Sequence, residues 1–330
     1  MNMKLKSVML GAAMASVAAM PVSNAIAKDY PPKTLSMVAP SGAGGGWDLT
    51  IRTVAKTLKD TKLVKSNMPV TNRPGGGGAV NLAYMQTQVG KDNLISVYSP
   101  PILLTNLNGS SKFSYKDTTP LGRLITDYAA FVVSKDSKYT SINQVMDALR
   151  KDPKSVKIGG TSSAGSMDHI QFLMIAKAAG VPNLSKIDYI SFQDGGAVAQ
   201  VLGGHVDLIS TGLGDVTSLV KSGNLRALAQ TADKRIGSGV IADIPTVKEQ
   251  GIDATFENWR GLFGPKDMPE YAVTFWNKTL KEMTETQEWS EARTRNGWDD
   301  AYQNSEQFNK FLAKTNEQYK EILNEVFSSK

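Results

Sequence analysis

Residues 37–58, "MVAPSGAGGGWDLTIRTVAKTL", contain a strand-like start, a turn dense in glycine and a helix-like end. The helix is predicted to run from Asp48 to Asp60, because apolar residues recur on one face at i, i+3, i+4 and i+7 (Ile51, Val54, Ala55 and Leu58). Glycine lets the turn bring backbone N–H groups close to a ligand, and the helix start adds unpaired donors. The stretch therefore predicts an α/β unit with an anion-binding turn.

Strand-like and helix-like segments continue to alternate in two sets of similar size. The first set includes strands in "PVTNRPG" (69–75) and "NLISVYSP" (93–100), and the second begins at "SVKIGG" (155–160). An extended run at 121–135 separates the sets, and the chain after Pro269 is predicted to be helical. This order is typical of mainly parallel sheets flanked by helices. Two such α/β units predict a cleft between them.

Length and charge limit the possible architectures and partners. With 330 residues, the chain is long enough for two domains. We predict a first lobe from residues 28–127 and 256–330, and a second lobe from residues 128–255. The net charge is +6 and the basic residues are scattered, so no nucleic-acid partner is expected.

The N-terminal segment resembles a cleavable signal peptide. Lys4 and Lys6 make a basic start, residues 8–20 are apolar, and Ala25-Ile26-Ala27 provides small residues for cleavage. The apolar run is shorter than the ~20 residues that a transmembrane helix needs. We therefore predict a signal peptide over residues 1–27 and a mature protein exported to the periplasm.

The sequence lacks the usual marks of nucleotide binding and catalysis. The dinucleotide pattern G-x-G-x-x-G fails from Gly42 and from Gly75, because its last position holds Trp47 and Val80. His169 and His205 are the two histidines, there is no cysteine, and G-x-S-x-G does not occur. We expect no enzyme activity, no cofactor and no metal site.

Two further turns repeat the design of the first. "GGTSSAGSMDH" (159–169) and "SFQDGGAVAQ" (191–200) each place small or hydroxylated residues between a strand end and a helix start. One such turn alone is more often an ordinary βα connection. Several turns at the carboxyl ends of strands in two facing units favour ligand binding, because ligands of open α/β sheets bind there.

Individual residues in these turns allow two interpretations. Asp48 is expected to cap its helix through its carboxylate. Trp47 either lines the ligand pocket or packs against the sheet. His169 is expected to form a hydrogen bond or pack rather than to catalyse, and His205 is expected to begin a strand. Trp259 and Arg260 are expected to pack at the hinge.

The predicted ligand-binding set joins the three turns to nearby strand ends. It consists of Ser41, Gly42, Ala43, Gly44, Gly45, Gly46, Trp47, Asp48, Tyr98, Ser99, Thr161, Ser162, Ser163, Ala164, Gly165, Ser166, His169, Gln193, Asp194, Gly195 and Ser210.

Seven segments, in order, resemble those of the substrate-binding receptors of tripartite tricarboxylate transporters, the Bug-type solute receptors. They are "APSGAGGGWDLTIR", "VTNRPGGGGAVN", "GGTSSAGSMDH", "SFQDGGAVAQVLGGHVD", "GNLRALAQTADKR", "IPTVKEQGID" and "NWRGLFGP". The resemblance implies a type II-like, two-lobed periplasmic-binding-protein fold that closes like a Venus flytrap. It also implies that the first glycine turn and residues 160–166 hold a carboxylate from opposite lobes, partly through water.

The resemblance further implies a function in uptake. A receptor of this kind delivers a small carboxylate to the integral-membrane permease subunits of its transporter, and a monomer is expected. The long "GAGGGWD" turn is similar to the tricarboxylate branch, which favours a ligand such as citrate. The alternatives are a dicarboxylate, an aromatic carboxylate, or a role as ligand-sensing partner of a signalling system.

Overall fold

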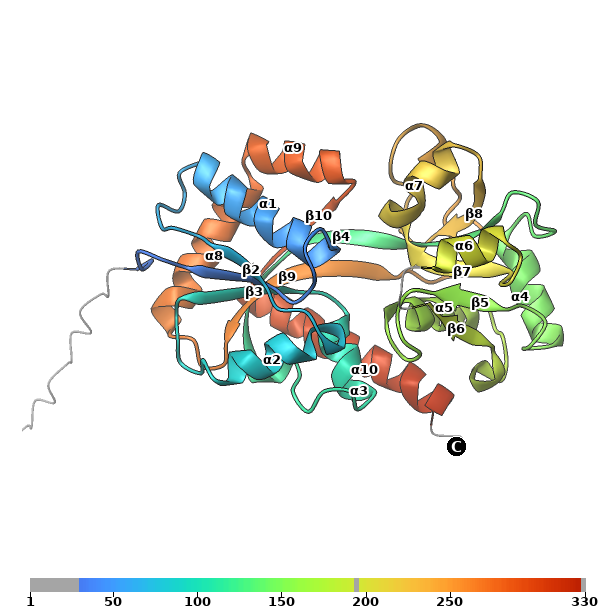
Figure 1. The fold of residues 1–330 in the computed structure, drawn as a ribbon, viewed down its shortest axis with the longest axis horizontal. Coiled ribbons are helices and arrows are strands. Elements are labelled where there is room, and N and C mark those ends of the chain that lie inside the picture. Colours follow the sequence, from blue (N-terminus) through green and yellow to red (C-terminus); the bar gives the residue numbers. More distant parts are fainter. Residues whose placement is uncertain (1–29, 193–195, 328–330) are drawn as a thin grey trace, which may run out of the picture.

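The computed structural model describes residues 30–192 and 196–327, so the predicted signal peptide lies outside the described residues. Two α/β lobes lie side by side and are connected by long strands (Figure 1). Within the described residues, no helix combines the length and the apolar character that crossing a bilayer requires.

Each lobe contains three parallel strands, as predicted. In the first lobe, β1 (Ser36–Ala39) pairs with β2 (Val70–Asn72) and with β3 (Leu94–Tyr98). In the second, β5 (Ile158–Gly160) pairs with β6 (Tyr189–Ser191) and β7 (Leu208–Gly212). Strands β3 and β7 are buried along their whole length, as is common for strands in a sheet that is covered on both faces.

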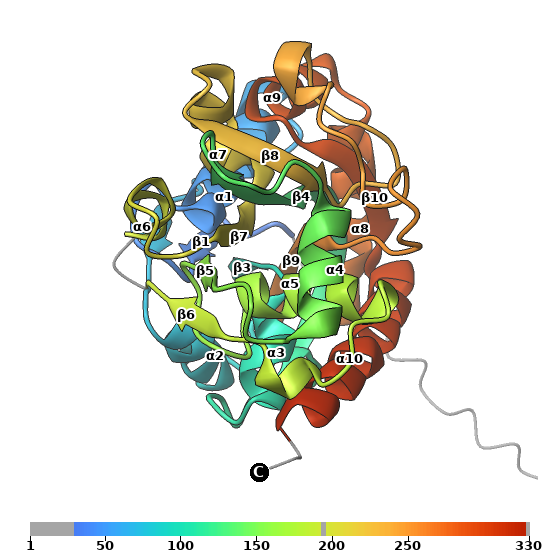
Figure 2. The same cartoon turned by 90° about the vertical axis from the view of Figure 1, so that its right-hand side faces the viewer.

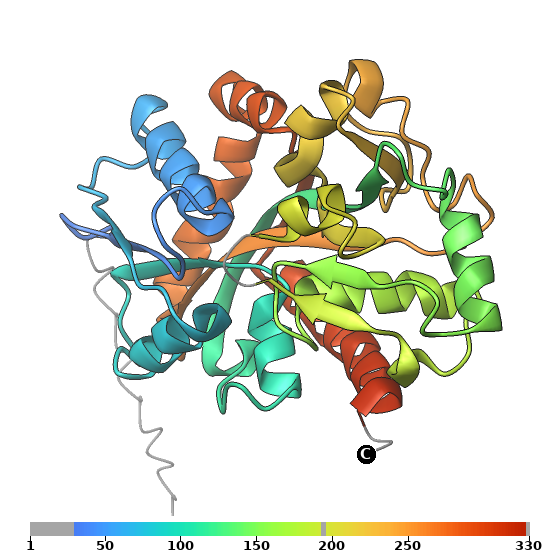
Figure 3. The ribbon, with the colours of Figure 1, turned by 45° about the vertical axis from the view of Figure 1, so that its right-hand side comes forward.

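Strand β4 (Thr118–Ser134) belongs to both lobes, and the strands around it make the complete sheet mixed. Up to Tyr128 it pairs antiparallel with β9 (Glu257–Pro265), and from Ala129 it pairs antiparallel with β7 and with β8 (Leu225–Gln230). Strand β4 passes from one lobe to the other, and the chain crosses a second time just before β9 (Figure 3). The backbone of β4 therefore makes a continuous connection between the two sheets.

Ten helices cover the sheets of the described residues. Their bounds are α1 Gly46–Asp60, α2 Ala79–Gln86, α3 Pro101–Leu107, α4 Ile142–Lys151, α5 Met167–Ala178, α6 Ala197–Leu202, α7 Leu213–Lys221, α8 Glu270–Thr284, α9 Gln287–Asn296 and α10 Ser305–Phe327. Helix α1 buries the predicted apolar face, with Ile51, Val54 and Leu58 inaccessible to solvent. It begins at Gly46, two residues before the predicted start.

The prediction of an entirely helical C-terminal part was wrong at β10 (Asp299–Asn304). This strand pairs antiparallel with β4 at the edge of the first lobe. Its sequence, "DDAYQN", lacks apolar residues at alternate positions, so the prediction missed it. Backbone hydrogen bonds to β4 stabilise this strand, and the local sequence pattern gives no sign of that pairing.

Helix α10 contacts elements of both lobes (Figure 2). Phe308 near its start packs on Trp259 of β9, with ring centroids 5.4 Å apart. Near its end, Glu325 forms an ion pair of 2.8 Å with Lys177 of α5. Phe327, the last residue of the helix, is 38% exposed, and its ring lies edge-on to His169. The helix therefore connects the lobes on one side of the molecule.

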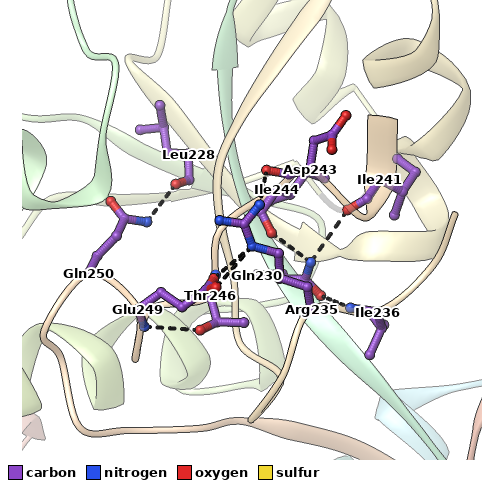
Figure 4. A network of polar contacts seen from close by, with 10 residues as sticks. All are labelled: Leu228, Gln230, Arg235, Ile236, Ile241, Asp243, Ile244, Thr246, Glu249 and Gln250. Atoms are coloured by element: carbon purple, nitrogen blue, oxygen red, sulfur yellow. Dashed lines mark hydrogen bonds and ion pairs between the residues drawn. The ribbon is translucent and has the colours of Figure 1, made fainter. Parts of the chain in front are cut away.

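Polar contacts fix the irregular segment after β8 (Figure 4). Buried Gln230 donates to the carbonyl oxygen of Ile244 at 2.8 Å, and its own side-chain oxygen accepts the N–H of Ile236. Arg235 binds both carboxylate oxygens of Glu249 at the surface. This network organises the chain where it returns towards the first lobe.

Candidate functional site

The first glycine turn is held from within by Asp48. One carboxylate oxygen of Asp48 accepts the N–H of Gly44 at 2.9 Å, and the other accepts Nε of Arg52 and Nδ2 of Asn72. Gly44 has φ of +80°, a conformation that favours glycine. The hydrogen bond from Arg52, together with those from Gly44 and Asn72, lowers the pKa of Asp48 to about 2. The carboxylate of Asp48 therefore stabilises the conformation of the turn.

The capping prediction for Asp48 was wrong in its details. The N-cap residue of α1 is Gly45, and Asp48 is the third residue of the helix. Within the described residues, the N–H groups of Gly46 and Trp47 have no hydrogen-bond partner. They lie at the positive end of a 15-residue helix. The turn thus offers free donors to an anion.

Trp47 packs against the first lobe and keeps part of its ring exposed. Its Nε1–H donates to Oγ of Ser99 at 2.9 Å, and its ring lies 5.9 Å from that of Tyr98. Tyr98 is completely buried, and its hydroxyl donates to the carbonyl oxygen of Gly78. In this structure Tyr98 has no surface for a ligand, and Ser99 is 4% exposed. Both residues support Trp47.

The second turn, residues 161–166, is held in the same manner by Asp168. One carboxylate oxygen of Asp168 accepts the N–H and the hydroxyl of Thr161 at 2.8 and 2.9 Å, and the N–H of Ser162 at 2.9 Å. Within the described part of the chain, the N–H groups of Ser163 and Ala164 have no partner, and both residues are exposed. These two amides are the donors that the second turn offers.

His169 supports this turn from a buried position. Its Nδ1 accepts the N–H of Gly165 at 3.0 Å, and its ring stacks on Tyr189 at 4.4 Å. Burial lowers the pKa of His169 to about 4. The side chain is thus a neutral structural acceptor at pH 7, in line with the preferred interpretation of the sequence. The residue is 5% exposed.

This buried histidine predicts a pH dependence of stability. The pKa of His169 is about 4 in the folded chain and 6.5 as its reference value, so the unfolded chain binds the proton more strongly. Its contribution is complete above about pH 6.5 and is lost as the pH falls towards 4. Urea unfolding of wild type and His169→Gln should diverge over that window, with the variant less sensitive to acid. Parallel curves would contradict the assignment.

Other predicted residues lie in different surroundings. Ser210 is completely buried, where its hydroxyl donates to the carbonyl oxygen of Asp168 and links β7 to α5. Gln193, Asp194 and Gly195 lie outside the described residues. His205 does not begin a strand: it occupies an exposed bend, and β7 starts at Leu208, because the glycine pair before it forms the turn.

Arg260 of β9 lies beside the first turn, a position that the expectation of hinge packing did not include. Its Nη2 atom lies 2.9 Å from the point that a Cβ atom on Gly46 would occupy. Its Nη1 atom is 4.0 Å from a carboxylate oxygen of Asp127 on β4. In the sequence, a charged residue within the apolar run "NWRGLFGP" was the sign that Arg260 has a special position.

A groove of about 340 Å³ lies between the lobes. Residues at the start of α7, among them Gly214, line one side, residues 294–297 at the end of α9 line another, and Asp127 also contributes. A larger cavity of about 770 Å³ lies elsewhere, among lysines at the end of α1. Within the described residues, neither turn lines the groove or this cavity. In the described ranges, no group of three or more His, Cys, Asp or Glu residues is arranged to hold a metal.

Comparison with known proteins shows one consistent relationship. A sequence model described as "Tripartite tricarboxylate transporter family receptor" matches residues 50–327. "Protein BugT" of Bordetella pertussis is 25% identical over 99% of this chain and 98% of its own length. A "UPF0065 protein" of Agrobacterium vitis is 27% identical over 73% of this chain and 68% of its own.

Solved structures share the fold. A "TctC solute binding protein from Polaromonas" has a TM-score of 0.72 and 26% identity, covering 89% of this chain and 99% of its own. A Rhodopseudomonas palustris protein solved with adipate has a TM-score of 0.75 at 20% identity, covering 90% and 98%. MatC of the same organism, with bound malate, has a TM-score of 0.71 at 17% identity, covering 89% and 100%.

Proposed function

Because the chain belongs to the tripartite tricarboxylate transporter receptor family, we propose that it captures a small carboxylate in the periplasm and delivers it to the permease subunits of such a transporter. The protein is a two-lobed solute receptor of the periplasmic-binding type. Export through the N-terminal signal peptide, action as a monomer and absence of enzyme activity belong to the proposal.

The observation that supports carboxylate capture is the pair of turns with unoccupied amides. Gly46 and Trp47 offer N–H groups in one turn, and Ser163 and Ala164 offer them in the other. Carboxylate oxygens accept such hydrogen bonds without a positively charged side chain. In each turn an aspartate already binds the neighbouring donors, so the free amides have fixed positions before the ligand arrives.

We propose that the ligand binds the first turn and that the second lobe then rotates towards it. The proposed lobes are residues 28–127 with 256–330, and residues 128–255. The change in pairing of β4 between Tyr128 and Ala129 supports a hinge at this position. A ligand that contacts both turns stabilises the closed state through its greater affinity for that state.

A tricarboxylate such as citrate is our first choice of ligand. The long glycine turn and the arginine beside it suit a ligand with more than one carboxylate. The structural relatives solved with adipate and with malate keep dicarboxylates as the second choice. An aromatic carboxylate, or sensing on behalf of a signalling system, remains an alternative for the same site.

Titration calorimetry with the mature chain tests the proposal. The panel contains citrate, tricarballylate, malate, succinate, an aromatic acid and inorganic phosphate. We expect micromolar or tighter binding of at least one di- or tricarboxylate, and no binding of phosphate. Binding of none of the acids, or turnover of ester substrates by the pure protein, would contradict the proposal. Native mass spectrometry of the purified protein would identify a ligand that remains bound.

A further inference from the structure

Arg260 has hydrogen-bond donors without acceptors in the described part of the chain. Its side chain is 11% exposed, and the buried Nε and Nη1 atoms have no hydrogen-bond partner there. The ion pair with Asp127 spans 4.0 Å, which is too long for a hydrogen bond. A buried guanidinium with unused donors is unfavourable unless another acceptor binds it. The side chain therefore has donors that the described residues leave unused.

The guanidinium lies where elements of the two lobes meet. It adjoins Gly46, whose N–H is one of the free donors of the first turn. A Cβ atom on Gly212, at the start of α7, would lie 2.8 Å from Oδ2 of Asp215 and 3.9 Å from Oδ2 of Asp127. One cation and two carboxylates thus gather beside the proposed anion site.

We propose that Arg260, Asp127 and Asp215 form a subsite for a carboxylate that carries a hydroxyl group on the adjacent carbon. The proposal rests on the function proposed above. The planar guanidinium donates parallel N–H bonds to a carboxylate. Two ionised aspartates would repel a carboxylate alone, because they are only acceptors. A neighbouring hydroxyl gives one of them a hydrogen-bond donor, so a 2-hydroxy acid supplies both an acceptor for Arg260 and a donor for an aspartate.

The surroundings of the two aspartates support this match. Tyr128 donates its N–H to Asp127 at 2.8 Å, and the Thr211 hydroxyl and Gly212 N–H donate to Asp215. Burial raises the pKa of the Asp127 carboxyl despite the opposing effect of Arg260. The pKa of Asp215 is raised for the same reason, although the residue as a whole is exposed to solvent. Each carboxylate has acceptor capacity for a further donor.

Calorimetry with two ligand pairs tests the subsite, since malate and succinate, and likewise citrate and tricarballylate, differ only by one hydroxyl. We expect wild type to bind the hydroxylated member of at least one pair about 10-fold more tightly, the effect of one hydrogen bond to a charged group. In Arg260→Gln, the affinity for that acid should fall at least ~30-fold and the preference for the hydroxyl below about 3-fold. Asp215→Ala should lose the preference with a smaller loss of affinity.

Two further variants control for folding and for net charge. Arg260→Lys keeps the charge without the planar fork and should bind with intermediate affinity. Arg235→Gln removes a guanidinium that pairs with Glu249 away from the site, and should bind like wild type (Figure 4). Thermal melts verify that each variant is folded, and Arg260→Lys replaces Arg260→Gln in the comparison if the latter is not.

The outcomes distinguish the subsite from the general function. Equal affinity of wild type for both members of each pair would overturn the subsite and leave carboxylate capture intact. The subsite is likewise overturned if the folded Arg260 variants bind all four acids within about 3-fold of wild type, the limit expected for a side chain without ligand contact. If wild type binds none of the four acids, the proposed function fails and the subsite fails with it.

Discussion

Valine in place of Gly44 is expected to weaken carboxylate binding at least ~100-fold while the chain stays folded. Gly44 has φ of +80°, which a β-branched residue adopts only with strain of about 1–2 kcal/mol or more. Relief of this strain moves the turn, breaks the bond from the Gly44 N–H to Asp48, and displaces the amides of Gly46 and Trp47. Two lost hydrogen bonds of about 1.5 kcal/mol each correspond to ~100-fold in affinity.

Gly90→Val is the matched control for this variant. Gly90 has φ of +75°, and both glycines have open space around the position of a Cβ atom. It lies in a surface turn whose N–H bonds to Lys266, outside both candidate turns. Both variants should lose similar stability in thermal melts, but only Gly44→Val should lose affinity in calorimetry. Equal affinities of the two variants would exclude the first turn from the site.

Replacing Asp168 with alanine is expected to lower the free energy of unfolding by about 3 kcal/mol and to abolish detectable binding. The change removes the acceptor of three donors, from Thr161 and Ser162, at a position that is 2% exposed. Burial raises the pKa of the Asp168 carboxyl, so its charge is partly uncompensated. The loss is therefore smaller than the sum of three bonds to a charged group. Urea unfolding and calorimetry measure the two effects.

Asp207→Ala is the control for this variant, because it removes an aspartate of the second lobe that does not hold the second turn. The Asp207 carboxylate accepts one N–H, from Lys157 at 2.8 Å, near the surface. Its removal should cost less than about 1 kcal/mol and leave binding unchanged. If Asp168→Ala and Asp207→Ala lose the same stability, the second turn does not depend on its aspartate.

The alternating pattern allowed most of the sheet and helix order to be predicted, because burial imposes a period on apolar residues. Helix α1 illustrates this, since Ile51, Val54 and Leu58 recur at helical spacing and are buried together. Strand β10 lacked this signal: its position results from pairing with β4, and none of its six residues is fully buried. Pairing at a sheet edge depends on the tertiary structure, which a local pattern does not contain.

For the candidate site, the sequence indicated the turns, but not which of their N–H groups bind an aspartate and which are left for a ligand. Asp48 and Asp168 each stand in the first turn of a helix, and both carboxylates turn back to bind amides of the preceding loop. That geometry depends on loop dihedral angles, which sequence spacing does not specify. The arginine in "NWRGLFGP" was visible as a charge in a buried strand, but only the structure showed Gly46 beside it.

The contacts of α10 with both lobes restrict the path of any domain movement. Phe327 and Leu323 lie 3.3 and 3.6 Å from the Cβ position of Gly165, so the second turn rests on the end of this helix. The chain passes between the lobes in β4 and again just before β9, and α10 contacts the second lobe at a different place. A rotation that lifts α5 from α10 would expose apolar surface, whereas a rotation in which α5 slides along α10 keeps it covered. We therefore expect the domain movement to be a sliding of α5 along α10, and a crosslink between the two helices to prevent it.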